Sequence, residues 1–336
     1  MQQNACHVDQ ARATLERIPS IAFGPVPSRR LGRSLGINNI PPKACSYSCL
    51  YCQVGPTAVT EIEPRGFYKP RKVLRCVTER LAVLAPRGEQ VDWLTFVSDG
   101  EPTLDVSLGE TIDLLRPLGI PIAVISNASL VWREDVRAIL AKADWLSLKV
   151  DATNPAIWSR VNRPNPILRL EAILDGIAAL ATRFPGTLTT ETMLVAGVND
   201  SAESVGAVAD YLATVQPTVA YLAVPTRPPA EPGVRAPDEF SLTRAYHAFS
   251  TSLTRVEYLL GYEGDTFAST GKIEDDILAV TAVHPLREDA LRALLAKAGV
   301  EWPVVERLLA TDALRAVDYA GHRFYHRVLP RIHIQG

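Results

Sequence analysis

Residues 45–52 read CSYSCLYC, and this stretch brings Cys45, Cys49 and Cys52 together in one short segment, the cysteine loop. Its C-x3-C-x2-C spacing lets the backbone turn back on itself, so that a single loop can present three thiolates to one metal centre. A tetrahedral zinc site and an iron–sulfur cubane normally take four protein ligands. The spacing therefore predicts either a fourth ligand elsewhere in the chain or an iron that is left open to a small molecule.

Two other interpretations of the cysteines stay open. A structural zinc ion would need Cys6 or Cys76 as its fourth ligand, because no histidine lies between His7 and His247. A disulfide with one spare thiol would need an oxidising compartment, whereas thiols in the cytosol stay reduced. The first residues contain no apolar run of signal-peptide length, which does not favour the disulfide.

The composition is that of an ordinary globular protein. The chain has 336 residues, of which 47% are hydrophobic and 21% charged, enough for one large domain and a small one. With 35 Lys and Arg against 37 Asp and Glu, the net charge of −2 gives no overall attraction to nucleic acid or to a membrane. The sequence has no apolar stretch long enough to cross a bilayer, and we expect a cytoplasmic protein.

Predicted strands alternate with predicted helices over most of the chain, which favours a parallel sheet. The expected fold is α/β, a partial (β/α)6 TIM-type barrel over residues 23–262 that follows an N-terminal helical extension, residues 1–22, with a helix at 8–18. The strands are expected at 35–40, 93–98, 122–126, 145–150, 188–195 and 218–224, and the helices at 71–84, 108–115, 133–143, 168–184, 203–215 and 242–260. Residues 23–27, which include Pro25 and Pro27, are expected to be irregular, and residues 28–34 to form a loop with three arginines.

Polar residues follow the predicted strands one after another. Ligands bind at the carboxyl ends of barrel strands, so these residues are candidates for a ring around a site. Loops are polar in any protein, but recurrence at successive strand ends favours the ring. Its members are Asp99, Gly100, Glu101, Pro102, Ser126, Asn127, Lys149, Asp151, Gly197, Asn199 and Arg227.

Four arginines are candidates for anchoring a charged substrate, because their planar guanidinium groups suit carboxylates and phosphates. They are Arg29, Arg30, Arg163 and Arg227. Ordinary ion pairs are the alternative role for each of them. Residues 225–240 read PTRPPAEPGVRAPDEF and form either a linker or a lid over the site.

The tail, residues 273–336, reads as a separate small domain. Three short helices at 274–283, 287–298 and 303–310 precede a hairpin at 314–319 and 323–329, as in a winged helix-turn-helix. Acidic residues balance Arg and Lys in this tail, which does not favour DNA binding over a protein-binding or packing role. The basic residues at the hairpin are Arg315, Arg323, Arg327 and Arg331.

The cysteine loop, with aromatic Tyr51 before its last cysteine and Gly100-Glu101-Pro102 after the next strand, resembles the radical S-adenosylmethionine (SAM) enzymes over residues 24–260. The runs SRRLGRSLGINNIPPKACSYSCLYCQVG, FVSDGEPTLD and DATNPAIWSRVNRP are similar to a largely uncharacterised group of iron–sulfur oxidoreductases. That group is related to the wyosine-forming tRNA-modifying enzymes.

The resemblance implies a 4Fe–4S cluster on Cys45, Cys49 and Cys52, with the fourth iron chelated by the amino and carboxylate groups of SAM. A flavodoxin- or ferredoxin-type donor would supply the electron that cleaves SAM to methionine and a 5′-deoxyadenosyl radical. Asp99 stands where the family has a first glycine. The implied cofactor-binding residues are Tyr51, Gly100, Glu101, Pro102, Ser126, Asn127, Lys149 and Asp151.

The expected function is hydrogen abstraction by this radical from an RNA or a small metabolite. Alternatives are a peptide-modifying enzyme whose tail recognises the peptide, and an iron–sulfur DNA-binding regulator. In the open-site interpretation, Cys6 and Cys76 are not cluster ligands.

Overall fold

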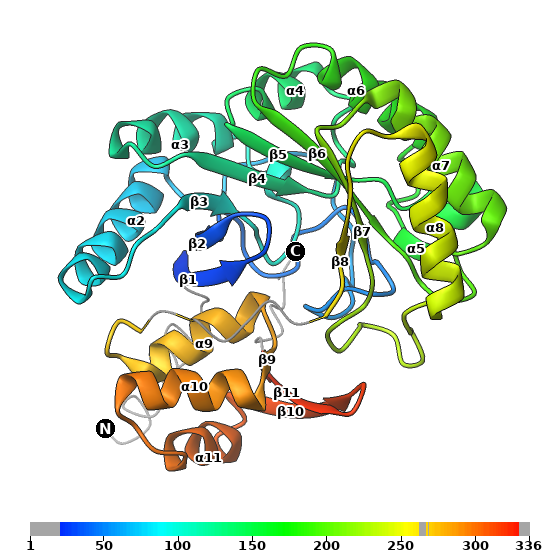
Figure 1. The fold of residues 1–336 in the computed structure, drawn as a ribbon. Helices are drawn as coiled ribbons and strands as arrows, with labels where there is room; N and C mark the ends of the chain where they lie inside the picture. The colour runs from blue at the N-terminus through cyan, green and yellow to red at the C-terminus, as the bar shows by residue number, and fades with distance from the viewer. Residues whose placement is uncertain (1–20, 262–266, 268, 329–336) are drawn as a thin grey trace, which may run out of the picture.

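The computed structural model describes residues 21–261, 267 and 269–328. The helix expected at 8–18 and Cys6 lie outside the described residues. A curled eight-stranded sheet forms the larger body, and its strands lie side by side in chain order (Figure 1). They are β1 Ala22–Ser28, β2 Gly32–Ile37, β3 Trp93–Phe96, β4 Ile122–Ser126, β5 Trp145–Lys149, β6 Thr187–Met193, β7 Val219–Ala223 and β8 Val256–Leu259.

All neighbouring strands from β2 to β8 pair in parallel, and only β1 runs antiparallel to its neighbour. Helices cover the outer face of the curled sheet, which confirms the predicted partial barrel (Figure 1). These helices are α2 Pro70–Leu84, α3 Leu108–Leu115, α4 Glu134–Leu140, α5 Pro155–Asn162, α6 Leu170–Ala181, α7 Ala202–Val215 and α8 Glu239–Ser252, with short 3-10 turns η1 Ala85–Arg87, η2 Pro102–Leu104 and η3 Arg116–Leu118.

The strands form because short apolar runs can be buried from both faces. Leu94, Phe96, Leu146 and Leu148 are fully buried, as expected for inner strands of a parallel sheet. Side-chain caps fix where several helices begin: for example, Ser201 accepts a hydrogen bond from the Ser204 amide at the start of α7. Because β2 to β5 run parallel, their carboxyl ends meet at one edge of the sheet.

The prediction was wrong for the segment before the cysteine loop. Residues 23–27, expected to be irregular, belong to β1, which is an edge strand of the sheet. An edge strand tolerates Pro25 and Pro27, which cannot donate a backbone hydrogen bond, because one of its sides has no neighbouring strand. The basic segment 28–34 is a tight β1–β2 turn that runs into β2, and not a long loop.

Two further elements differ from the prediction. The helix expected at 242–260 is two elements: α8 ends at Ser252, where Leu253 is extended, and β8 follows. A short apolar run fits a strand as well as a helix, so its periodicity could not separate the two. Helix α5 was missed; it starts where Asn154 accepts hydrogen bonds from the Ala156 and Ile157 amides.

The tail packs beside β1 at the edge of the barrel (Figure 1). Its helices and hairpin lie close to the predicted positions and enclose a separate apolar core around Ile277, Leu291 and Val305. A short strand, β9, was not predicted and joins the hairpin in a three-stranded antiparallel sheet. The winged helix-turn-helix assignment stays a prediction. The elements are α9 Ile273–Val283, β9 Leu286–Arg287, α10 Glu288–Ala298, α11 Pro303–Ala310, β10 Leu314–Tyr319 and β11 His322–Arg327.

No helix in the described ranges is both long enough and apolar enough to cross a membrane.

Candidate functional site

The cysteine loop follows the carboxyl end of β2 and is held by backbone hydrogen bonds on two sides. On one side the Lys43 amide donates to the Asp99 carbonyl at 3.0 Å, just beyond β3. On the other, the Ser48 and Leu50 amides donate to carbonyls at the end of α5, the latter to Val161 at 3.0 Å. The loop is therefore fixed between the ends of β3 and α5.

Gly100 permits the closest approach in this region. Its neighbour Glu101 donates its amide to the Ala44 carbonyl at 2.9 Å, which pulls the strand end against the loop. A Cβ atom at position 100 would lie 1.9 Å from that same carbonyl oxygen. Only glycine fits here, because nothing in the backbone of Ala44 can move aside without displacing the loop.

The three loop cysteines are half-buried free thiols, and Cys76 is also free. Burial raises the pKa of the Cys45 thiol above its usual range, and the neighbouring Cys49 adds to this. Burial is the main cause that raises the pKa of Cys49 to about 12, and the charge of Asp151 adds to it. The hydrogen bond from Asn162 opposes the rise. Thiolates at these positions need a nearby positive charge, which a bound metal centre supplies.

The donor set fits an iron–sulfur cluster, whose ligands are cysteine thiolates with one on each iron. Within the described residues, no three Cys, His, Asp or Glu side chains converge on a point that could hold a single metal ion. Cys76, the described candidate for a fourth zinc ligand, lies on helix α2, where it packs against the apolar core.

Glu101 is completely buried and ties the ends of β3 and β4 together. Its Oε1 accepts from Ser126 Oγ at 2.7 Å and from Thr103 Oγ1 at 2.6 Å, and its Oε2 accepts from the Asn127 amide at 2.7 Å. Burial raises the pKa of this carboxyl, while its hydrogen-bond donors oppose the rise. The Glu101 side chain therefore positions the strand ends, and Pro102 beside it begins turn η2.

Asp99 is buried, and one of its carboxylate oxygens lacks a partner. Asn38 Nδ2 donates to Oδ2 at 2.9 Å, but Oδ1 has no hydrogen bond to any described residue. Burial raises the pKa of Asp99 to about 7, although Asn38 and the charges of Lys43 and Arg327 lower it. This carboxyl is therefore costly to ionise where it stands.

Tyr51 and Asp151 connect the cysteine loop to β5. The Tyr51 hydroxyl donates to Asp151 Oδ2, which also accepts from Asn162 Nδ2 at 2.7 Å. The Met193 amide donates to Asp151 Oδ1 at 2.8 Å, and Asn199 Nδ2 donates to the Asp151 carbonyl at 2.9 Å. Three residues, from the cysteine loop, the end of α5 and the end of β6, thus donate to one carboxylate, and Asn199 donates to the backbone of the same residue.

Lys149 takes part in a buried charge cluster with Arg30 and Glu191. Lys149 Nζ lies 2.7 Å from Glu191 Oε1, and Arg30 Nη1 lies 2.5 Å from Glu191 Oε2. Burial alone would raise the pKa of Glu191, but the two cations and their hydrogen bonds lower it to about 2. Lys149 also lies over the Tyr51 ring, 4.8 Å from its centroid.

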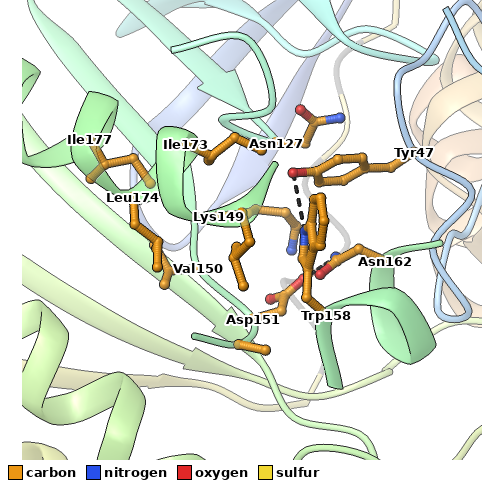
Figure 2. A pocket seen from close by; sticks show the side chains of 12 residues that line it. Tyr47, Asn127, Lys149, Val150, Asp151, Trp158, Asn162, Ile173, Leu174 and Ile177 are labelled. Carbon is orange, nitrogen blue, oxygen red and sulfur yellow. Dashed lines mark hydrogen bonds between the residues drawn. The ribbon is translucent and has the colours of Figure 1, made fainter. Parts of the chain in front are cut away.

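Figure 2 shows a small cavity that Lys149 and Asp151 line together with Tyr47 and Trp158. Trp158 Nε1 donates to the Tyr47 hydroxyl at 3.3 Å, and the two rings pack edge to face. Asn127 also lines this cavity, and apolar residues of α6 close it from the other side. The cavity between them has a volume of about 10 Å³, which suits one water molecule.

A larger cavity of about 340 Å³ lies between the barrel and the tail. Residues 53–55, directly after the cysteine loop, form one wall, and Pro228 to Ala230 form another. The tail contributes residues of α9, β10 and β11. Gln53 Nε2 also donates to the Val283 carbonyl at 2.8 Å, so the tail contacts the chain one residue after Cys52.

The four candidate substrate arginines do not gather in one place, and all have protein partners. Arg29 is bonded to the Leu260 and Gly261 carbonyls, Arg30 to Glu191, Arg163 to Glu231 and Arg227 to Gln53 and His284. Of the four, Arg30 is beside Lys149 through their shared carboxylate, and Arg227 is beside the end of the cysteine loop. Gly197, the predicted ring residue after β6, lies on an exposed turn, where its amide donates to the Asp200 carboxylate.

Sequence reasoning missed Lys43 and Asn162, which contact cysteine sulfurs, and Asn38, which contacts Asp99. Lys43 and Asn38 precede the cysteine loop, and Asn162 ends the unpredicted helix α5. An amide or amine just outside a ligand loop has no distinguishing spacing, so only the helix boundary at Asn162 could have pointed to it.

Comparisons with known proteins agree with this geometry. The family model described as the radical SAM superfamily matches residues 39–208. A UPF0026 protein of Methanocaldococcus jannaschii is 42% identical over 308 residues, or 91% of this chain and 95% of that relative. A radical SAM methyltransferase from Sphaerobacter thermophilus has the same fold with a TM-score of 0.51 and 18% identity, covering 68% of this chain and 67% of that one. SuiB from Streptococcus suis, solved with S-adenosylmethionine, gives a TM-score of 0.50 at 14% identity, covering 68% and 52%.

Proposed function

The chain belongs to the radical SAM superfamily and is a radical SAM enzyme, and from this premise we propose that Cys45, Cys49 and Cys52 hold its 4Fe–4S cluster. Radical SAM enzymes use this cluster and S-adenosylmethionine as cofactors. The observation that carries the proposal is the cysteine loop itself, in which three free, half-buried thiols are clamped between β3 and α5. In the proposal neither Cys6 nor Cys76, which stands on α2 outside the loop, is a ligand, so one iron stays open for the cofactor.

When bound, the reduced cluster and S-adenosylmethionine would supply the chemistry, a one-electron reductive cleavage of the cofactor to methionine and a 5′-deoxyadenosyl radical. The residues of this chain bind and orient. In the proposal, Gly100 and Glu101 would receive the amino group of the methionine part, and the Glu101 side chain holds this strand end in place through its bonds to Ser126 and Asn127.

The remaining cofactor contacts are proposed from the strand ends around the loop. The Lys149 ammonium would face the cofactor's carboxylate, and the Ser126, Asn127 and Asp151 side chains would face its ribose. The backbone at Tyr51 would contact the adenine, while its hydroxyl keeps the bond to Asp151. Since the methionine part of the cofactor carries charged groups, opposite charges fixed beforehand lower the cost of binding it.

The substrate is proposed to be an RNA or a small metabolite that carries negative charge, with Arg29, Arg30, Arg163 and Arg227 as its candidate anchors. The Arg30 guanidinium lies 5.8 Å from the centroid of the Trp145 ring and 5.7 Å from that of the Tyr221 ring, and its side chain is 12% exposed against 44% for Arg163. A small flavodoxin- or ferredoxin-type protein would supply the electron.

Anaerobic reconstitution tests the function. The full chain, loaded with iron and sulfide and reduced with dithionite in the presence of S-adenosylmethionine, should release 5′-deoxyadenosine. The Cys49→Ala variant should release none. An intact cluster, verified by its iron content and visible absorption, that gives no 5′-deoxyadenosine with any reductant would disprove the enzymatic proposal.

The tail does not favour the alternative of a DNA-binding regulator. Its exposed arginines face carboxylates of the tail itself, as Arg323 does with Asp318 and Arg307 with Glu274. Such pairing leaves little net positive charge for a phosphate backbone. Titration of labelled duplex DNA at several salt concentrations should therefore show no steep salt dependence. A steep salt dependence would support the hypothesis of a DNA-binding regulator.

A further inference from the structure

Each cysteine sulfur of the loop has its own nitrogen donor. Lys43 Nζ lies 3.5 Å from Cys52 Sγ, Asn127 Nδ2 lies 3.6 Å from Cys45 Sγ, and Asn162 Nδ2 lies 3.5 Å from Cys49 Sγ. The three donors come from three separate elements: the segment before the loop, the end of β4 and the end of α5.

The Asn127 amide is oriented by bonds on both of its ends. Its Oδ1 accepts from the Ser129 amide at 2.9 Å, which leaves Nδ2 as the atom that faces the loop. Nδ2 also donates to Ser46 Oγ at 3.0 Å. An amide flip would set Nδ2 against the Ser129 N–H group and break that bond, so the N–H group toward Cys45 is fixed by the Ser129 amide.

Asn162 is fixed in the same sense by Asp151. An ionised carboxylate can only accept hydrogen bonds, so the 2.7 Å contact to Asp151 Oδ2 must come from the amide nitrogen. The second hydrogen of that nitrogen is shared between Cys49 Sγ at 3.5 Å and the Tyr51 hydroxyl oxygen at 3.3 Å. Asn162 is buried, with 2% of its surface exposed, so water does not compete for this contact.

Lys43 is the one donor of the three that carries a formal charge. Its ammonium is held by the Gly55 carbonyl at 2.5 Å, directly beyond the cysteine loop. Its backbone adopts a left-handed conformation, φ 65°, and its amide bonds to Asp99. A lysine rarely adopts this conformation, and here it aims a half-buried ammonium at Cys52.

We infer that Lys43, Asn127 and Asn162 raise the reduction potential of the cluster, and that Lys43 contributes most. The inference rests on the proposed cluster ligands. Reduction adds one electron from an external reductant, and part of the added negative charge falls on the cysteine sulfurs. Hydrogen bonds to those sulfurs stabilise the reduced cluster more than the oxidised one. A cation beside Cys52 does so more strongly than a neutral amide, because its attraction acts on the full added charge.

Redox titration of the reconstituted full chain tests the inference without relying on turnover. The midpoint potential is followed by the electron paramagnetic resonance signal of the reduced cluster, with no S-adenosylmethionine present. Lys43→Met should shift the midpoint to a more negative value, and Lys43→Arg should restore most of it. Asn127→Ala should give a smaller shift in the same direction.

Lys142→Met is the matched control, because it removes the same charge elsewhere. Lys142 precedes β5 and pairs with Asp113, at the edge of the sheet opposite the cysteine loop. Its midpoint should equal that of the unmodified chain. An equal shift in Lys142→Met would mean that overall charge is the cause, and would overturn the inference.

Cluster loading separates this inference from the proposed function. Iron and sulfide contents report whether the cysteines hold a cluster, whatever its potential. A chain that loads no cluster contradicts the proposed function. If the Lys43→Met chain loads a cluster and its midpoint potential is unchanged, only the inference is contradicted. If Lys43→Met fails to load a cluster, Asn127→Ala takes its place, and an unchanged midpoint potential in that variant overturns the inference.

Discussion

Arg80 of helix α2 donates from Nη1 to Asp276 Oδ1 of helix α9 at 3.0 Å, and this buried ion pair joins the barrel to the tail. Arg80 also donates from Nε to the Gly24 carbonyl in β1 at 2.8 Å. Asp276 has no exposed surface and accepts further bonds from Thr270. One arginine therefore connects three elements that are far apart in the sequence.

Replacing Arg80 with methionine should destabilise the protein, because Asp276 would remain buried without its cation. The free energy of unfolding should fall by roughly 3 kcal/mol, which is the lower end of the losses seen when one partner of a buried ion pair is removed. We expect the lower end because Thr270 still donates to the Asp276 carboxylate. Urea denaturation followed by circular dichroism measures the change.

The double variant Arg80→Met/Asp276→Asn is the control. It removes both charges, so it should recover a large part of the lost stability. If the double variant is no more stable than Arg80→Met, the uncompensated charge is not the cause, and the loss comes from the packing of the arginine stem instead.

Gly100→Ala should displace the cysteine loop. The added methyl group would meet the Ala44 carbonyl at 1.9 Å, a contact that requires the backbone to move. We expect the variant to bind less iron on reconstitution, and its free energy of unfolding to fall by roughly 2 kcal/mol or more, as for overpacked sites.

Gly206→Ala is the matched control for the same chemical change. Gly206 lies inside helix α7, and a Cβ there meets nothing within 4 Å. Alanine favours a helix over glycine, so this variant should be slightly more stable and should load iron normally. Equal iron loading in the two variants would show that the contact at Gly100 does not set the loop's position.

The helices and strands of the barrel could be predicted because their apolar residues repeat with a clear period over a long stretch. Helix α3 and strand β4 agree with the sequence expectation at both ends. The prediction failed where another effect outweighed periodicity. Pro25 and Pro27 indicated an irregular segment, and only the position of β1 at the sheet edge makes them acceptable in a strand.

In the site, too, local spacing could be predicted from the sequence, whereas contacts between separate strands could not. Spacing in the sequence singled out Cys45, Cys49 and Cys52, since ligand loops have short, regular intervals. It could not reveal that Glu101 is satisfied by Ser126 and Asn127, because those bonds join separate strand ends. Sequence order carries no information on which side chains meet across neighbouring strands until the register of those strands is known.

Cys76→Ala should leave the iron content of the reconstituted chain unchanged. Cys76 is a half-buried thiol on α2, outside the cysteine loop, and its role is packing. Its removal should cost about 1 kcal/mol of stability at most. Cys52→Ala provides the contrast, because loss of a loop thiol should abolish cluster binding. A loss of iron in Cys76→Ala would bring back a site closed by four protein ligands.

Asp99 should make the protein less stable as the pH rises from 4 to 7. Its folded pKa of about 7 lies above the ordinary value of 3.8, because burial penalises the charged carboxylate. Below pH 4 both the folded and the unfolded chain hold the proton, so the group has no effect. Between the two pKa values only the folded chain holds it, so stability falls with rising pH, and above pH 7 the loss is complete.

Asp99→Asn tests this sign, because asparagine resembles the protonated acid and can keep the bond from Asn38 Nδ2 to its side-chain oxygen. The variant should exceed the unmodified chain in stability by more at pH 8 than at pH 5, the increase being about 2–3 kcal/mol for a shift of this size. Urea denaturation at both pH values measures it on the cluster-free chain. An advantage that is constant or shrinks as the pH rises would mean that the Asp99 carboxylate is ionised without penalty, and that Lys43 and Arg327 compensate its charge in full.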